Sequence, residues 1–190
     1  MSDGSDTVAY VGDLLTFAIR RASQAPELPG LAPGAHFGLR RGTSATRWYE
    51  AGCLLETTDP AGAIAAYERA VTSCPVLADA HNNLGRLHHD VGIPAIAESC
   101  YRLAICADPS VALYWFNLGV AVEDQGRHAE AITAYERAVE IDGHVADTHF
   151  NLARLLELNA RRVGDDVMLQ RAVRHLLRYR DLTRRDAKAR

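Results

Sequence analysis

The sequence predicts an all-α fold, a solenoid of stacked antiparallel helix hairpins, from three observations. Residue types recur at a fixed offset of 34, small and aromatic residues alternate at helical spacing, and glycines and prolines recur between the apolar stretches. A single hairpin of this length cannot bury its apolar face, so stacked neighbours supply the core, and about three repeats are needed. At 190 residues and 48% apolar composition, the chain has enough material for one such domain.

The period is clearest over residues 78–160. An alanine–tyrosine–alanine triad at offsets of four and three puts two small residues and one ring on the same helix face, where a neighbouring helix can approach closely. The matching sets are Asn83, Asn117 and Asn151; Leu84, Leu118 and Leu152; Gly85 and Gly119; and the triads centred on Tyr67, Tyr101 and Tyr135. This pattern resembles the tetratricopeptide repeat (TPR) family, and the resemblance implies a right-handed superhelix of helix hairpins.

Residues 1–43 precede the repeats and have a different composition. Residues 7–22 have an amphipathic helical pattern, with Val8, Val11, Leu15 and Ala18 on one stripe, and residues 24–42 are rich in proline and glycine, which predicts a loop. We expect the helix to pack on the exposed end of the first repeat. The alternative is a docking or oligomerisation helix.

Residues 44–182 are predicted to form about four repeats, at about 45–77, 78–111, 112–145 and 146–182. The middle two are regular, with helices expected at 112–123 and 129–141 around Gly126. The first repeat fits best with one residue deleted in the turn at 57–60, which brings Gly52 into register. The fourth needs about seven extra residues around 162–168, and terminal repeats are often atypical.

Charge is unevenly distributed along the chain. Residues 161–190 contain 10 basic and 4 acidic side chains, whereas residues 1–160 contain 11 basic and 20 acidic. A solvated helix face followed by a basic tail at 183–190 accounts for this better than a nucleic-acid site, because no set of aromatic residues interleaves with the arginines and Tyr179 is better explained as a core residue. We therefore expect no nucleic-acid partner.

Composition indicates a soluble cytoplasmic protein. No apolar run approaches the ~18 residues of a membrane helix, so we expect no membrane partner. The four cysteines form no Cys-x-x-Cys pair and are predicted to be small buried residues in a reducing compartment. Abundant alanine and arginine with a single lysine, Lys188, is typical of a bacterial genome of high GC content.

Motifs for catalysis or metal binding are missing from the sequence. There is no glycine-rich phosphate loop and no His-Glu-x-x-His sequence. His81 and His88 are two helical turns apart, about 10.5 Å, which is too far for one metal ion. We predict a non-enzyme with no cofactor and no metal.

Function is then expected on the surface that the repeats create. Positions 2, 6, 9 and 13 of each first helix lie opposite the buried stripe, and in the TPR family this side lines a concave groove. The resemblance places a peptide-binding set there and at the shoulders of the groove: Asn82, Asn83, Arg86, His89, Phe116, Asn117, Val120, Phe150, Asn151 and Arg154.

The asparagines at position 6 are the most specific feature of that surface. An amide offers both a donor and an acceptor, so Asn83, Asn117 and Asn151 can pair with the backbone of an extended peptide about every third residue. They resemble the asparagine ladder of the O-GlcNAc transferase repeats, although the chain has no glycosyltransferase segment. The alternative is that these asparagines form hydrogen bonds within the repeats.

Co-chaperone TPR proteins bind a C-terminal carboxylate through lysine, asparagine and arginine at defined groove positions. Those positions hold Asn82, Arg86, Asn117, Asp147 and Asn151 here, so only one asparagine agrees. The sequence therefore favours a non-catalytic scaffold that binds an extended segment of another protein. The alternatives are a substrate-recruiting subunit of a neighbouring enzyme, such as a glycosyltransferase or kinase, and a self-associating structural module.

Overall fold

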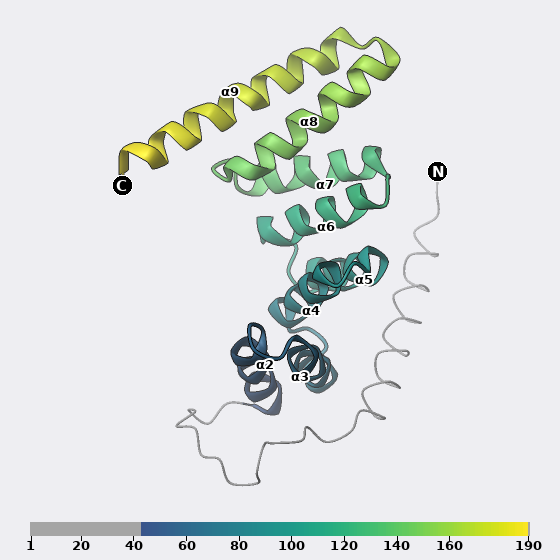
Figure 1. The fold of residues 1–190 in the computed structure, drawn as a ribbon, viewed down its shortest axis with the longest axis vertical. Coiled ribbons are helices and arrows are strands. Elements are labelled where there is room, and N and C mark those ends of the chain that lie inside the picture. Colours follow the sequence, from purple (N-terminus) through teal and green to yellow (C-terminus); the bar gives the residue numbers. More distant parts are fainter. Residues whose placement is uncertain (1–42, 190) are drawn as a thin grey trace. The chain divides into compact units, whose positions relative to one another are not determined.

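The computed structural model describes residues 43–189, and every regular element among them is an α-helix. The helices pair as antiparallel hairpins, so the all-α prediction is confirmed (Figure 1). The amphipathic helix predicted at 7–22 and the loop predicted at 24–42 lie outside the described residues. In chain order the helices are α2 (Ser44–Leu55), α3 (Pro60–Ser73), α4 (Ala78–Asp90), α5 (Pro94–Ala107), α6 (Ala112–Asp124), α7 (His128–Ile141), α8 (Ala146–Val163) and α9 (Asp166–Ala189).

The described residues form two compact units that divide between Ala107 and Asp108. Unit 1 contains the hairpins α2–α3 and α4–α5, and unit 2 contains α6–α7 and α8–α9. Within each unit the hairpins pack through their middle helices, α3 against α4 and α7 against α8. Each unit is thus one stacked pair of hairpins.

Local sequence explains where the helices begin and end. The Asp59 side chain accepts a hydrogen bond of 3.0 Å from the Gly62 N–H, and Pro60 occupies the first turn of α3, where its missing N–H costs nothing. Gly92 and Gly126 follow α4 and α6 with φ of +78° and +76°, a left-handed conformation that glycine adopts without a Cβ clash. The predicted helices around Gly126 are therefore correct to within one residue.

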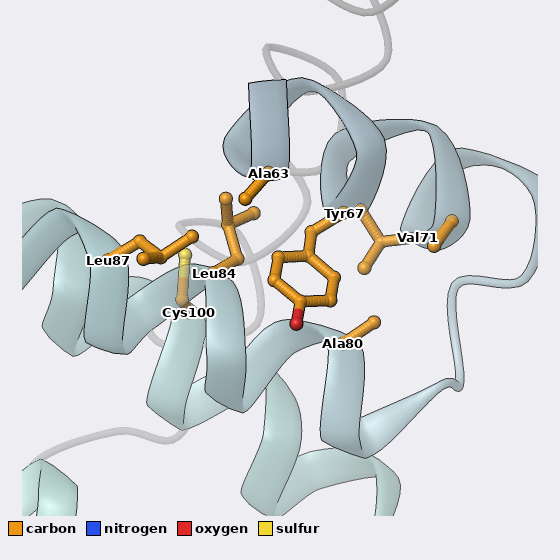
Figure 2. Packing of buried hydrophobic residues seen from close by; sticks show 8 residues of the cluster. Ala63, Tyr67, Val71, Ala80, Leu84, Leu87 and Cys100 are labelled. Atoms are coloured by element: carbon orange, nitrogen blue, oxygen red, sulfur yellow. The ribbon is translucent and has the colours of Figure 1, made fainter. Parts of the chain in front are cut away.

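The core of unit 1 is the contact between α3 and α4. Tyr67 is fully buried and points from α3 toward α4, between Leu84 and Ala80 (Figure 2). Ala63 and Ala70, on the same face of α3, are also fully buried. The alanine–tyrosine–alanine triad of α3 therefore packs as predicted. Its two small residues let α4 approach closely enough to cover the tyrosine ring.

Each tyrosine of the three alanine–tyrosine–alanine triads is matched by a glycine on the first helix of its own hairpin. A Cβ atom on Gly85 would lie 2.7 Å from a ring carbon of Tyr101, and one on Gly119 would lie 2.5 Å from Tyr135. Gly52 stands in the same relation to Tyr67, at 2.6 Å. Gly52 is in register with Gly85 and Gly119 only in the alignment that deletes one residue in the turn at 57–60.

Unit 2 differs from unit 1 in the length of its last hairpin. Helix α8 has 18 residues and α9 has 24, against 13 and 14 for α6 and α7, and the long pair runs side by side (Figure 1). The extra residues expected around 162–168 therefore extend both helices instead of forming a loop. Gly164, at φ +73°, ends α8 in the left-handed conformation.

Ring nitrogens near the start of three first helices fix the preceding turn. His81 Nε2 lies 2.9 Å from the Pro75 carbonyl, and Trp115 Nε1 donates to the Pro109 carbonyl at 3.0 Å. His149 Nε2 lies 3.2 Å from the carbonyl of Gly143, one repeat length further on. In each case the ring nitrogen pairs with a turn carbonyl that would otherwise have no hydrogen-bond partner from the helix.

The cysteine prediction is only partly correct. Cys100 is buried, as expected, but Cys53 and Cys106 are exposed and Cys74 is half-buried at the end of α3. Helical position alone does not determine burial, because a cysteine is small enough to be tolerated on either face of a helix. Among the described residues, no helix is both long and apolar enough to cross a membrane.

Candidate functional site

Four polar side chains from α3, α4 and the turn after α2 meet in unit 1 beside the covered ring of Tyr67. The Tyr67 hydroxyl donates to Glu56 Oε1 at 2.6 Å, and Asn83 Nδ2 donates to the same hydroxyl oxygen at 3.2 Å. Arg86 Nη2 closes the set with an ion pair of 2.5 Å to Glu56 Oε2. We call Glu56, Tyr67, Asn83 and Arg86 the unit 1 cluster.

An equivalent set lies in unit 2. The Tyr135 hydroxyl donates to Glu123 Oε2 at 3.0 Å, and Glu123 Oε1 forms an ion pair with Arg154. A hydrogen bond from the Asn151 side chain stabilises the phenolate form of Tyr135 and so lowers its pKa, opposing burial. We call Glu123, Tyr135, Asn151 and Arg154 the unit 2 cluster.

The two clusters follow the sequence period. Their tyrosines, asparagines and arginines are separated by two repeat lengths, whereas the glutamates fall one residue short because of the deletion after Glu56. At the positions between the two clusters, the sequence has His89 in place of the glutamate and Val120 in place of the arginine. The sequence therefore provides this polar set once in each unit.

Burial keeps both phenols protonated. Removal from water raises the pKa of Tyr67 above its usual range, and hydrogen bonds to Cys53 and Glu56 raise it further. Burial likewise raises the pKa of Tyr135, helped by the nearby charge of Glu123. Each hydroxyl is therefore a permanent donor to its glutamate, which leaves the hydroxyl oxygen to accept from asparagine.

The unit 1 cluster fixes the orientation of the Asn83 amide. One Nδ2 hydrogen is directed to Tyr67, and Asn83 Oδ1 accepts from Asn82 Nδ2 at 3.2 Å. The Asn83 side chain also forms a hydrogen bond to Tyr49 that lowers the pKa of that phenol, so both N–H donors of the amide are used and one carbonyl lone pair of Oδ1 remains for a ligand. Asn83 is half-buried, on the surface of α4.

The other predicted site residues of unit 1 also lie on α4. Asn82 is 5% exposed, so its main contribution is to hold Asn83. Arg86 pairs with Asp90 at 3.4 Å as well as with Glu56, and His89 is half-buried. The α4 surface is therefore polar and charged.

The predicted site residues of unit 2 lie on α6 and α8 and are more apolar. The Phe116 ring lies 5.8 Å from that of Tyr135, and the Phe150 ring lies 5.3 Å from that of Tyr179. Phe150 remains 42% exposed. Asn117 and Val120 are half-buried on α6, and Asn151 is half-buried on α8. The exposed leucines Leu113 and Leu158 occupy the outward positions 2 and 13 of these helices.

The sequence pattern placed Glu123 at the shoulder of the predicted groove but did not identify Glu56 or the two tyrosine hydroxyls as part of the site. Tyr67 and Tyr135 were assigned to the core for their rings, but a buried tyrosine hydroxyl almost always has a hydrogen-bond partner. That requirement, together with an arginine three residues after the asparagine, could have pointed to Glu56 and Glu123. No group of three or more potential metal ligands occurs among residues 43–189.

Comparison with known proteins agrees with this architecture. The family profile described as "Tetratricopeptide repeat" matches residues 82–146, about a third of the chain. Residues 82–146 thus match the tetratricopeptide repeat family. A search of curated protein sequences gave no significant match.

Several solved structures share its fold. A crystal structure of MamA superposes with a TM-score of 0.68 over 99% of both chains, at 19% identity. MamA 41-end from Desulfovibrio magneticus RS-1 gives 0.62 over 74% of this chain and 76% of that one, at 20% identity. The first TPR of Spaghetti (RPAP3), bound to the HSP90 peptide SRMEEVD, gives 0.59 over 62% of this chain and 94% of that one, at 21% identity.

Proposed function

We propose that this TPR protein is a non-catalytic scaffold that binds an extended segment of another protein. The observation that carries the proposal is the asparagine amide fixed by a tyrosine, a glutamate and an arginine in the unit 1 cluster, with an equivalent set in unit 2. A fold shared with a peptide-binding repeat protein supports the general class. The segment would bind where the TPR family has its concave groove.

The chemistry of the proposed contact follows from the remaining capacity of the asparagines. An extended chain presents one N–H and one C=O per residue, and Asn83 Oδ1 retains one lone pair that can accept from such an N–H. Contacts to the backbone tolerate many sequences. Because the amide is already oriented, little side-chain entropy is lost when a ligand binds, which favours affinity.

Side-chain selection would differ between the units. On unit 2, the exposed Phe150 and the neighbouring Val120 and Phe116 favour apolar side chains of the ligand. On unit 1, Arg86 and His89 favour polar or acidic side chains. Successive side chains of an extended segment point to opposite faces, so we expect alternate ligand residues to be selected.

We further propose that the protein works in the cytoplasm. Cys53 and Cys106 are exposed free thiols, which persist in a reducing compartment and are oxidised readily elsewhere. We propose a protein partner in preference to nucleic acid or membrane, since no aromatic ladder accompanies the arginines of α9.

The test is affinity capture from a native lysate with three forms of the full chain. These are the wild type, the triple variant Asn83→Ala, Asn117→Ala, Asn151→Ala, and a control triple variant Thr72→Ala, Ser99→Ala, Thr133→Ala. The control hydroxyls are exposed and bond only to backbone carbonyls of their own helices. A partner retained by the wild type and the control but lost by the asparagine variant supports the proposal. Equal retention by all three would place recognition elsewhere.

A further inference from the structure

The last described helix has one apolar face that no other described helix covers. Helix α9 packs on α8 through a different face, where Ala172 and Leu182 are buried and the Tyr179 ring lies 5.3 Å from that of Phe150. Away from that contact, four aliphatic side chains at helical spacing are between 38% and 49% exposed. We call them the α9 stripe: Leu169, Val173, Leu176 and Leu177.

Helix α3 shows what the same face contacts in unit 1. With the seven extra residues of the fourth repeat taken into account, Leu176 aligns with Tyr67, whose ring is buried against α4. Val173 aligns with Ile64, which packs against the same core. No described helix follows α9 (Figure 1). The stripe therefore corresponds to a face that receives another helix when one is present.

The α9 stripe is also more apolar than the matching face of the inner helices. Leu177 aligns with a charged residue in each of the other second helices, namely Glu68, Arg102 and Glu136. A terminal helix that faces only water is expected to be more polar than the inner helices, because the outer face of a repeat array has to be solvated. The opposite difference at α9 favours a face that binds a further helix.

Basic side chains extend the stripe toward the end of α9. Arg180 and Arg184 follow Leu177 at spacings of three and seven residues, so they lie along the same side of the helix. Among the side chains that the structure describes, no carboxylate pairs with Arg184, and Arg180 pairs only with its exposed neighbour Asp181, at 3.0 Å. The helix that fits is therefore apolar opposite the leucines and acidic opposite the two arginines.

A second copy of this chain fits the face less well. Helix α9 contains seven basic and three acidic side chains, so two α9 helices packed together would repel each other. On α2, the first described helix, Leu54 is the only large apolar side chain that is strongly exposed. The α2 helix of another copy therefore offers too little apolar surface to cover four aliphatic side chains.

We propose that the α9 stripe binds an acidic amphipathic helix of another protein. Apolar contact with the stripe supplies the attraction, and carboxylates opposite Arg180 and Arg184 set the direction of the bound helix and accelerate the encounter. This surface takes a helix, whereas the asparagine site of the proposed function takes an extended segment. The two proposals are therefore independent, and either can fail alone.

The test measures the binding of a designed peptide to the full chain by fluorescence anisotropy. The probe is a fluorescein-labelled amphipathic helix of about 18 residues, with leucines on one face and glutamates on the other, which is long enough to span the stripe and the two arginines. A second peptide has lysine at every glutamate position. We expect the glutamate peptide to bind about tenfold more tightly in low salt, because its charge is opposite to that of α9.

Paired variants locate the peptide on the chain. Leu169→Gln with Leu177→Gln should weaken binding of the glutamate peptide by about tenfold, because the pair removes apolar area from the contact. Both side chains are exposed, so this variant should keep the wild-type melting temperature. Leu54→Gln, the same change at an exposed position of α2, should leave the affinity unchanged. Arg180→Gln with Arg184→Gln should weaken binding by about threefold and reduce its dependence on salt.

Each outcome supports the proposal or overturns it. Affinity that is lost in the leucine and arginine variants and kept in the α2 control and the asparagine triple variant supports it. Absence of binding, equal binding of the two peptides, or affinity unchanged by the leucine variant would overturn it. Binding lost in the asparagine triple variant would also overturn it, by placing the peptide in the other site. So would a chain that binds vesicles of anionic phospholipid and not the peptide, or a dimer in sedimentation that the leucine variant abolishes.

Discussion

Units 1 and 2 contain the same polar cluster in different surroundings. In unit 1 the cluster joins α3, α4 and the turn after α2 beside a charged surface, and in unit 2 it joins α6, α7 and α8 beside exposed Leu113 and Phe150. A tyrosine buried for packing carries a hydroxyl that must be paired, and pairing it fixes the neighbouring asparagine. The comparison teaches that the same packing of tyrosine and asparagine can lie beneath two surfaces that select different ligand side chains.

The largest effect is expected from the glycines that accommodate the tyrosine rings. Gly52→Ala and Gly119→Ala each place a Cβ within 2.6 Å of a ring, so each should lower the free energy of unfolding by about 2–4 kcal/mol. Urea unfolding followed by circular dichroism measures this loss. Gly143→Ala is the control, because its Cβ would come no closer than 3.5 Å to another atom. Similar losses at Gly52 and Gly119 would uphold the equivalence of the two units.

The next largest effect on the free energy of unfolding is expected from removal of the tyrosine hydroxyls. Tyr67→Phe and Tyr135→Phe should each cost about 1–2 kcal/mol of unfolding free energy, because each removes the link between glutamate and asparagine and keeps the ring. Tyr101→Phe is the matched control, since the sequence has His89 and Val120 where the clusters have glutamate and arginine. If Tyr101→Phe cost as much as the other two, the cluster would not be the source of the loss.

A histidine pair makes unit 2 sensitive to pH. His149 Nδ1 and His175 Nδ1 are 2.8 Å apart. Because His149 Nε2 donates to the Gly143 carbonyl, its neutral Nδ1 must accept from His175. Burial lowers the pKa of both rings, that of His175 to about 4, helped by the charges of Arg171 and Arg174.

The sign of the pH effect follows from these lowered pKa values. The unfolded chain binds protons near pH 6.5, whereas the folded pair stays neutral, so stability is lost as pH falls from about 6.5 toward 4. Allowing for solvent screening of a half-exposed ring, we expect a loss of about 1–2 kcal/mol between pH 7 and pH 4.5. Urea unfolding at both pH values measures it. His175→Gln should reduce the pH dependence, and His144→Gln, at an exposed position, should leave it unchanged.

The last prediction concerns a chaperone peptide, which we expect this chain to bind only very weakly. The positions that hold a chaperone carboxylate in co-chaperone repeats contain Asp147 and only one matching asparagine here. The peptide SRMEEVD, which RPAP3 binds, should therefore bind this chain with a Kd weaker than about 100 μM in calorimetry. Nanomolar affinity would show that the two units select a different ligand from the one proposed.

Sequence predicted the helices well because their signals are local. The triads around Tyr67 and Tyr135 and the glycines after α4 and α6 repeat at 34 residues, and packing follows directly from that spacing. The clusters were harder to predict, because their hydrogen bonds join side chains that are far apart in the sequence, and the one-residue deletion in the turn at 57–60 shifts Glu56 out of register with Glu123. The sequence predicted extra residues around 162–168 in the fourth repeat. It did not predict that they lengthen α8 and α9, because no other repeat has residues that align with them.

Calorimetric titration of the captured partner segment tests the central claim most directly. The wild type, the asparagine triple variant and the hydroxyl control would be compared at equal melting temperature. If the asparagines bind the partner backbone, affinity should fall by about 100-fold in the asparagine variant, since three hydrogen bonds at about 1 kcal/mol each are lost, and stay unchanged in the control. Equal affinity in all three proteins would contradict the account and leave the clusters with a structural role alone.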